Sequence, residues 1–141
     1  MKRLYILSLA LLSAVFASAQ DTWIVKMNKS TVLSGTTKTE QVKTKKLKAS
    51  EWKKNGFFEV IYKDKEKEEG WARTIILGDE EGNDIIRKDN VTNLKLELKY
   101  LRKEFNTQKK IMVYTFKTPT DPDLAARVRI RRVHLCTLEL R

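Results

Sequence analysis

The chain's only histidine, His134, and its only cysteine, Cys136, lie two residues apart near the C-terminus, in the stretch V-H-L-C-T-L-E-L. On a β-strand this spacing places both side chains on one face, where they could ligate a metal or act as a nucleophile and its base. A structural zinc site takes about four ligands, mostly histidine and cysteine, and this chain offers only these two. The apolar setting favours two half-buried core residues. A small hydrolase with a site near His134 is the alternative.

Three arginines, Arg127, Arg129 and Arg131, alternate with apolar residues just before this stretch. If Ala125–Arg141 forms one long terminal strand, their guanidinium groups line one face and could bind a carboxylate or a phosphate. The same row could equally be the solvated face of a one-sided sheet. Before Arg131-Arg132 the apolar residues occupy even positions, and Val133 and Leu135 after it occupy odd positions. This change of strand face predicts a β-bulge at Arg131-Arg132.

Lysines are concentrated in the first part of the chain after its apolar N-terminus. The stretch from Lys26 to Lys54 contains nine lysines against two glutamates. Within it, Lys43, Lys45 and Lys46 stand close together, and we include them with the arginines as candidate anion-binding residues. A surface of this kind attracts acidic glycans or lipid headgroups. Exposed lysines also keep edge strands soluble, which is the simpler interpretation.

Three tryptophans, Trp23, Trp52 and Trp71, could form a platform for sugar rings together with Tyr62. Large aromatic side chains in a domain of this size mostly fill the core. Trp23 and Trp71 lie in predicted strands, so we expect both to be buried. Trp52 lies in a polar turn, and it is therefore the predicted ligand-binding aromatic residue.

No sequence motif supports a specific enzyme activity. Neither Gly-x-Ser-x-Gly nor His-Glu-x-x-His occurs in the sequence, so serine hydrolases and zinc proteases of those classes are not indicated. Asp79, Glu81 and Asn83 alternate as calcium ligands could, but Gly82 is misplaced for an EF-hand loop and an acidic turn is the simpler interpretation. We expect no metal, no cofactor and no catalytic residue.

The N-terminus has the three parts of a secretory signal peptide. The charged start Met1–Arg3 precedes the apolar run Leu4–Phe16, and Ala17-Ser18-Ala19 offers a small-residue cleavage site. The apolar run is too short to span a bilayer. We expect residues 1–19 to be removed and the mature protein to be secreted or periplasmic. The short Lys-Arg start and the lysine-rich composition favour a bacterial source.

Residues 20–141 are sufficient for one domain with its own core. The formal net charge of the chain is +11, and it falls to +9 if Lys2 and Arg3 leave with the signal peptide. One cysteine cannot form an intrachain disulfide, so the core alone must stabilise the fold. Export and the lack of a recognisable nucleic-acid-binding motif disfavour a nucleic-acid partner.

Apolar alternation predicts the N-terminal strands. Thr22–Met27 is a short strand, and Val32–Gly35 is a turn or a second strand. The polar stretch Thr36–Lys48 is predicted to be an exposed edge strand. Ser50 could cap a single helical turn that ends at Asn55-Gly56.

Phe57–Lys63 and Trp71–Leu77 are two apolar runs separated by the polar loop Asp64–Gly70. This arrangement predicts a β-hairpin. A short strand at Ile85-Ile86 follows the next turn.

The stretch Val91–Phe105 fits the periodicity of both a strand and a helix. Its composition favours a helix, so we predict a strand at 91–96 followed by a helix at about 97–106. Lys110–Lys117 alternates as a clear strand. The chain should leave the sheet over the stretch Thr118–Asp123, and Asp121 could cap a helical turn at Pro122–Ala125.

About seven or eight short strands predict a mainly β protein. The expected fold is an antiparallel β-sandwich of jelly-roll or immunoglobulin-like type, with at most one short helix, near 97–106. We expect an exported, non-enzymatic binding or structural protein of the cell envelope. The alternatives are a basic module that binds an acidic glycan or lipid headgroup, and the small hydrolase. The expected partner is an acidic glycan, a lipid headgroup or an envelope protein.

Overall fold

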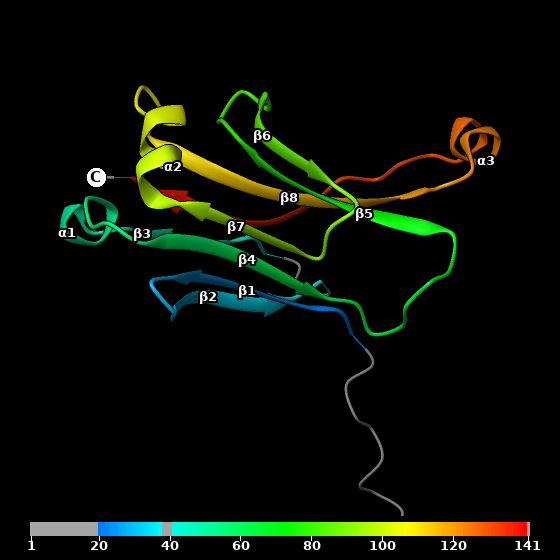
Figure 1. The fold of residues 1–141 in the computed structure, drawn as a ribbon, viewed down its shortest axis with the longest axis horizontal. Helices are drawn as coiled ribbons and strands as arrows, with labels where there is room; N and C mark the ends of the chain where they lie inside the picture. Colours follow the sequence, from blue (N-terminus) through cyan, green and yellow to red (C-terminus); the bar gives the residue numbers. More distant parts are fainter. Residues whose placement is uncertain (1–19, 38–40, 141) are drawn as a thin grey trace, which may run out of the picture.

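The computed structural model describes residues 20–37 and 41–140, where the chain is mainly β (Figure 1). The predicted signal peptide, residues 1–19, lies outside the described residues. Within them the strands form two sheets. The four-stranded sheet contains, in spatial order, β2 (Ser30–Thr36), β1 (Thr22–Met27), β4 (Phe57–Lys63) and β7 (Asn93–Glu97). The five-stranded sheet contains, in spatial order, β3 (Lys43–Lys46), β9 (Val133–Glu139), β8 (Lys110–Pro119), β5 (Trp71–Gly78) and β6 (Asp84–Asp89).

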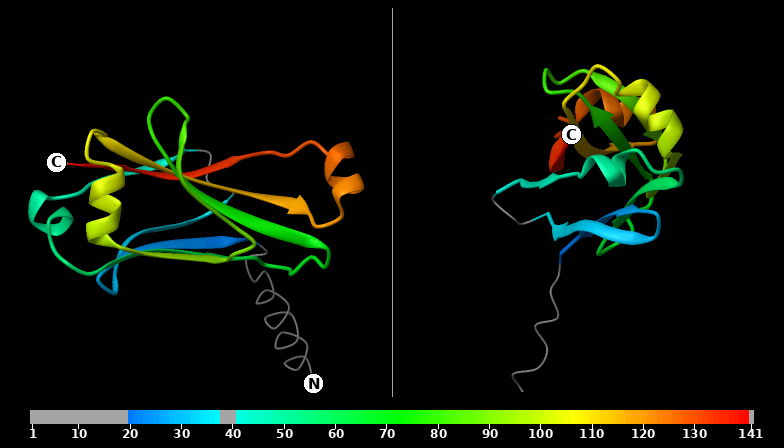
Figure 2. Two further views of the ribbon diagram at one scale, coloured as in Figure 1. Left: turned by 45° about the horizontal axis from the view of Figure 1, so that its top comes forward. Right: turned by 90° about the vertical axis from the view of Figure 1, so that its left-hand side faces the viewer.

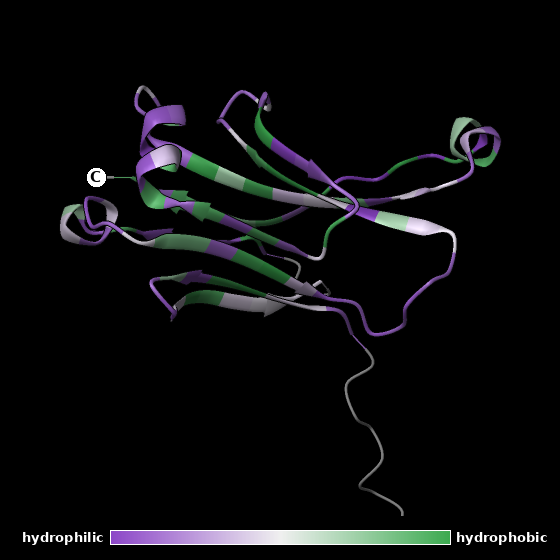
Figure 3. Cartoon of the chain, in the orientation of Figure 1, coloured by the Kyte–Doolittle hydropathy of each residue, from purple (hydrophilic) through white to green (hydrophobic). Residues whose placement is uncertain are grey.

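The two sheets pack face to face across one hydrophobic core. Strict alternation creates the buried face of β4, where Phe58, Val60 and Tyr62 point inward while Phe57 is exposed. Side chains of the opposite sheet, such as Ile111 and Val113 of β8, complete the core. Figure 3 shows hydrophilic residues along the loop from β4 to β5 and hydrophobic residues within the strands.

In the described part of the chain, three short helices connect the strands: α1 (Ala49–Trp52), α2 (Leu98–Glu104) and α3 (Pro122–Arg127). The prediction of at most one short helix was therefore wrong, although α2 lies where that helix was expected. Its buried residues Leu98 and Leu101 help to close one end of the core, and α3 projects at the opposite end of the long axis (Figures 1 and 2). Among the described residues, no helix is long and apolar enough to cross a membrane.

Most predicted strands are confirmed, two of them to the residue. The polar stretch around Lys43–Lys46 does form an edge strand, but it pairs with β9 in parallel. The sheets are therefore not wholly antiparallel. Asp121 caps α3 as predicted, because its side chain accepts a hydrogen bond from the N–H of Asp123 at 3.0 Å. Pro119 stays in β8 as its last residue, opposite Trp71, where a missing N–H is tolerated.

The predicted hairpin between Phe57–Lys63 and Trp71–Leu77 is wrong. Both strands exist, but β4 pairs with β1 and β7, whereas β5 pairs with β6 and β8. The loop 64–70 instead crosses from one sheet to the other. Hairpin signals report two neighbouring apolar runs, and they do not distinguish pairing within a sheet from packing across a core.

The predicted long terminal strand at Ala125–Arg141 is also wrong in its first half. α3 continues to Arg127, residues 128–132 are irregular, and the strand begins only at Val133. The bulge lies inside β9 rather than at Arg131-Arg132. Val113 pairs with Cys136 and Tyr114 with His134, which leaves Leu135 as the extra residue.

Candidate binding sites

His134 and Cys136 lie on opposite faces of β9. The bulge at Leu135 turns Cys136 into the core, where its side chain is fully buried, whereas the half-buried His134 stacks on Tyr114 with ring centroids 4.7 Å apart. Nε2 of His134 lies 2.9 Å from the carbonyl oxygen of Cys136 and 3.1 Å from Oγ1 of Thr137. The predicted placement of both side chains on one strand face is therefore wrong, because an extra residue changes the parity between them.

Burial shifts the pKa of both groups. It lowers the pKa of His134, and it raises the pKa of the Cys136 thiol to about 12. A thiol in that state is not a nucleophile at neutral pH. Over the part of the chain that the structure describes, no three His, Cys, Asp or Glu side chains gather in a way that could hold a metal ion.

The candidate lysines and arginines lie in different places. Lys43, Lys45 and Lys46 are exposed on β3, which runs beside residues 136–139 of β9. Nζ of Lys43 donates a hydrogen bond to the carbonyl of Ser34 at 2.6 Å and so links the edges of the two sheets. The arginines precede β9 and lie toward the opposite end of the long axis, near α3 (Figure 1).

We call residues 127–132 the arginine segment. Arg127, Arg129 and Arg131 are exposed, and Arg129 and Arg131 line an open hollow together with Ile130. Arg132 is anchored, since its guanidinium donates two hydrogen bonds to Asp84, at 2.9 and 3.2 Å.

Trp52 is not the exposed tryptophan that the sequence suggested. Only 9% of it is accessible, and Arg102 donates hydrogen bonds to the carbonyls of Trp52 and Lys54 beside it. The exposed tryptophan is Trp71, with 37% of its surface accessible. Trp71 is the first residue of β5 and directly follows Gly70, which ends the polar loop.

A partly buried ion cluster, which sequence analysis missed, joins the sheets near Trp71. Asp64 follows β4 of the four-stranded sheet, while Arg73 and Lys117 belong to β5 and β8 of the five-stranded sheet. Arg73 donates to both carboxylate oxygens of Asp64 and, from Nη1, to Oγ1 of Thr115 at 3.0 Å. Lys117 approaches Asp64 at 3.0 Å, and the Arg73 guanidinium lies 3.6 Å from the centre of the Tyr62 ring. We call Asp64, Arg73 and Lys117 the inter-sheet ion cluster.

The pKa values of Asp64 and of the neighbouring Tyr62 are both shifted from their ordinary values. Burial alone would raise the pKa of Asp64, but hydrogen bonds from Arg73 and Lys117 outweigh it and hold the pKa below its usual value. Burial, followed by a 2.7 Å hydrogen bond to Asp21, raises the pKa of the Tyr62 hydroxyl. Asp64 is therefore a carboxylate at neutral pH and lies between Arg73 and Lys117.

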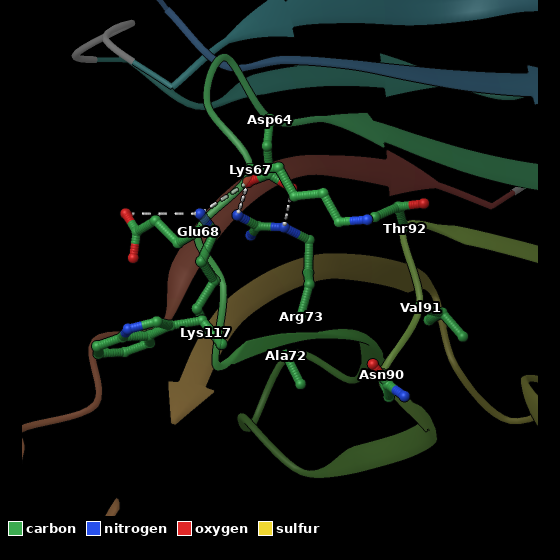
Figure 4. A pocket seen from close by; sticks show the side chains of 10 residues that line it. Asp64, Lys67, Glu68, Ala72, Arg73, Asn90, Val91, Thr92 and Lys117 are labelled. Atoms are coloured by element: carbon green, nitrogen blue, oxygen red, sulfur yellow. Dashed lines mark hydrogen bonds and ion pairs between the residues drawn. The ribbon is translucent and has the colours of Figure 1, made fainter. Parts of the chain in front are cut away.

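A cavity of about 250 Å³ opens beside the inter-sheet ion cluster (Figure 4). Its walls come from the loop 64–70, from the start of β5, from Lys117 of β8 and from the crossover 90–92 between β6 and β7. The crossover is held on both sides, because Val91 donates to the carbonyl of Arg73 and Tyr62 donates to the carbonyl of Thr92.

Comparison of the chain with protein families and with curated proteins finds no match that would assign a family or an activity.

Proposed function

We propose that this chain is an exported, non-enzymatic binding protein of the cell envelope, secreted or periplasmic in a bacterial source. It takes an anionic ligand, an acidic glycan or a lipid headgroup, through the arginine segment. Its scaffold is a β-sandwich of jelly-roll or immunoglobulin-like type. The N-terminal pattern of residues 1–19 supports export, and the face-to-face packing of two sheets supports the sandwich.

One contrast among the arginines carries the proposal. Seven arginines lie in the described residues. Four of them bond to the protein itself: Arg73 to Asp64, Arg87 to Asp89, Arg102 to two carbonyls and Arg132 to Asp84. Within that same part of the chain, Arg127, Arg129 and Arg131 have neither an ion pair nor a hydrogen-bond acceptor.

Such a group of guanidinium side chains is suited to bind carboxylate, sulfate or phosphate. Asp121 and Asp123 lie at the start of α3, and neither pairs with these arginines in the structure. The proposal that the protein is not an enzyme rests on Cys136, which is buried, and on His134, whose Nε2 lies within hydrogen-bond distance of the Cys136 carbonyl oxygen.

The test is binding to an immobilised sulfated or carboxylated polysaccharide and to vesicles that contain an anionic phospholipid, each at two salt concentrations. The triple variant Arg127→Gln, Arg129→Gln, Arg131→Gln should weaken binding about tenfold or more, and the remaining affinity should depend less on salt. The matched control removes the same number of charges through Lys43→Gln, Lys45→Gln and Lys46→Gln, and it should retain most of the affinity.

Equal losses in the two triple variants would mean that net charge alone drives binding, and the arginine segment would not be a site. Export is tested separately by N-terminal sequencing of the protein from the envelope fraction. The expected first residue is Gln20, and recovery of intact Met1 in the cytoplasm would contradict the proposal.

A further inference from the structure

The cavity beside the inter-sheet ion cluster has polar walls whose bonding capacity is not used by the protein. Lys67, Asn90 and Thr92 line it and are exposed. Over residues 20–37 and 41–140, none of these three side chains has a hydrogen-bond or ion-pair partner. In Figure 4 the side chain of Lys67 extends toward Thr92.

An aromatic surface completes the wall. Trp71 lines the cavity with more than a third of its surface accessible, whereas Trp23 and Trp52 are buried. An exposed aromatic ring can supply contact area to a small ligand, and the polar groups beside it can supply orientation.

The floor of the cavity is rigid. Arg73 is 7% exposed and held at once by Asp64, Thr115 and the Tyr62 ring. Asn90 has a positive φ of 55°, which asparagine adopts more readily than most residues, at the turn that follows β6. These contacts hold the wall in place before a ligand arrives, which lowers the cost of binding.

The charges of the wall favour a ligand with one negative charge. Lys67, Arg73 and Lys117 face Asp64 and Glu68. Asp64 is neutralised by Arg73 and Lys117, and Glu68 lies 3.9 Å from Lys117. Among the described residues, the ammonium group of Lys67 has no ion-pair partner, and it can pair with the carboxylate of a ligand.

We propose that this cavity binds one carboxylated sugar ring, a hexuronate. The C–H face of the ring packs on Trp71, its hydroxyls bond to Asn90, Thr92 and Glu68, and its carboxylate pairs with Lys67. A volume of about 250 Å³ lies below the range of cavities for drug-sized ligands and suits a single ring. The ring can be a free sugar acid or one residue of an acidic glycan. None of the arginines of the arginine segment lines the cavity, so this site stands independently of the function proposed above.

The test is a titration followed by ¹H–¹⁵N NMR on the ¹⁵N-labelled mature chain, residues 20–141. The probes are glucuronate, an oligomer of glucuronate and glucose at matched ionic strength. Glucuronate should shift the amide signals of residues 90–92 and the indole N–H of Trp71 saturably, with affinity in the millimolar range typical of weak sites. Glucose should bind about tenfold more weakly. Tighter binding by the oligomer would identify a glycan as the source, and equal binding would identify the free sugar acid.

Lys67→Gln and Trp71→Leu should each weaken glucuronate binding about tenfold, as read from the amide signals of residues 90–92. Lys65→Gln is the matched control, because Lys65 lies in the same loop and does not line the cavity. The arginine triple variant should bind glucuronate as the parent does. Absence of saturable shifts at residues 90–92, or full binding by both Lys67→Gln and Trp71→Leu, would overturn the proposal and leave the cluster as a purely structural contact.

Discussion

At the residue scale, Arg73 and Asp64 decide whether the two sheets stay in contact at the rim near Trp71. A buried charge is costly to desolvate, and the cost is compensated only while its partner is present. Asp64→Asn removes the charge that compensates Arg73, whose side chain is 6% accessible. We expect this variant to lower the free energy of unfolding by about 3 kcal/mol, measured by urea denaturation.

The exposed ion pair between Glu80 and Lys110 provides the control. These side chains approach to 3.6 Å but are each 40% or more accessible. Water and salt screen such a pair, so Glu80→Gln should change the free energy of unfolding by less than about 1 kcal/mol. If the two variants lost equal stability, the inter-sheet ion cluster would not have the structural role assigned to it.

The lowered pKa of Asp64 predicts a pH dependence with a definite sign. A carboxyl group whose pKa is lower in the folded state than in the unfolded state stabilises the fold above the unfolded value of about 3.9. That contribution is lost as the pH falls through the folded-state value. The stability difference between the parent and Asp64→Asn should therefore be constant from neutral pH down to about 5 and shrink below about 4. Urea midpoints at a series of pH values measure it, and a difference that grew in acid would contradict the assignment.

The candidate sites show which properties of a residue can be predicted from the sequence. The exposure of Arg127, Arg129 and Arg131 agrees with the prediction, because charged residues rarely leave water unpaired. The exposure of Trp52 and Trp71 was predicted the wrong way round, because it depends on which neighbours cover each ring. The inter-sheet ion cluster could not be predicted either, since its members come from three strand ends that only the tertiary fold brings together.

At the element scale, local pattern was enough to place strands but not to pair them. The strand at Thr22–Met27, the strand at Phe57–Lys63 and the strand-to-helix change near residue 97 were all predicted, because apolar period and composition are local properties. The sequence did not predict that loop 64–70 crosses between the sheets. It also did not predict that β3 pairs in parallel with β9, because strand pairing depends on distant segments. The helix α3 interrupted the expected arginine strand since Asp121 and Pro122 start a helix whatever alternation follows.

The turn between α1 and β4 depends on one glycine. Gly56 has a φ of +139°, and a Cβ atom there would lie 1.5 Å from Oδ1 of Asn28. That oxygen accepts the N–H of Phe57 at 3.0 Å and so ties the β1–β2 turn to β4. Gly56→Ala should cost about 3 kcal/mol in unfolding free energy, from backbone strain together with the clash.

A substitution at Gly70 separates the cost of backbone strain from the cost of the clash. Its φ is +76°, and a Cβ atom added there would meet nothing within 4 Å. Gly70→Ala should therefore cost only about 1 kcal/mol, the strain of the left-handed conformation. Thermal or urea unfolding of both variants measures the difference. Equal costs would show that Asn28 moves aside without loss and that the clamp on Phe57 is dispensable.

At the scale of the whole molecule, both sheets contribute to one core, and the energetic consequence is cooperative unfolding. The buried cluster includes Val60 of the four-stranded sheet, Val113 of the five-stranded sheet and Leu101 of α2. Neither sheet can keep its apolar face buried if the other one opens. We therefore expect all strands to unfold in one transition.

Val60→Ala and Val113→Ala test this expectation with the same chemical change in opposite sheets. Both side chains are fully buried, so each substitution should lower the free energy of unfolding by about 2 kcal/mol. Val42→Ala is the matched control, since Val42 is 43% exposed and should lose less than about 0.5 kcal/mol. Urea titrations followed by NMR amide signals of β1 and of β8 give one midpoint for each sheet. In either core variant both midpoints should shift together, and a shift confined to the mutated sheet would mean that the two sheets unfold independently.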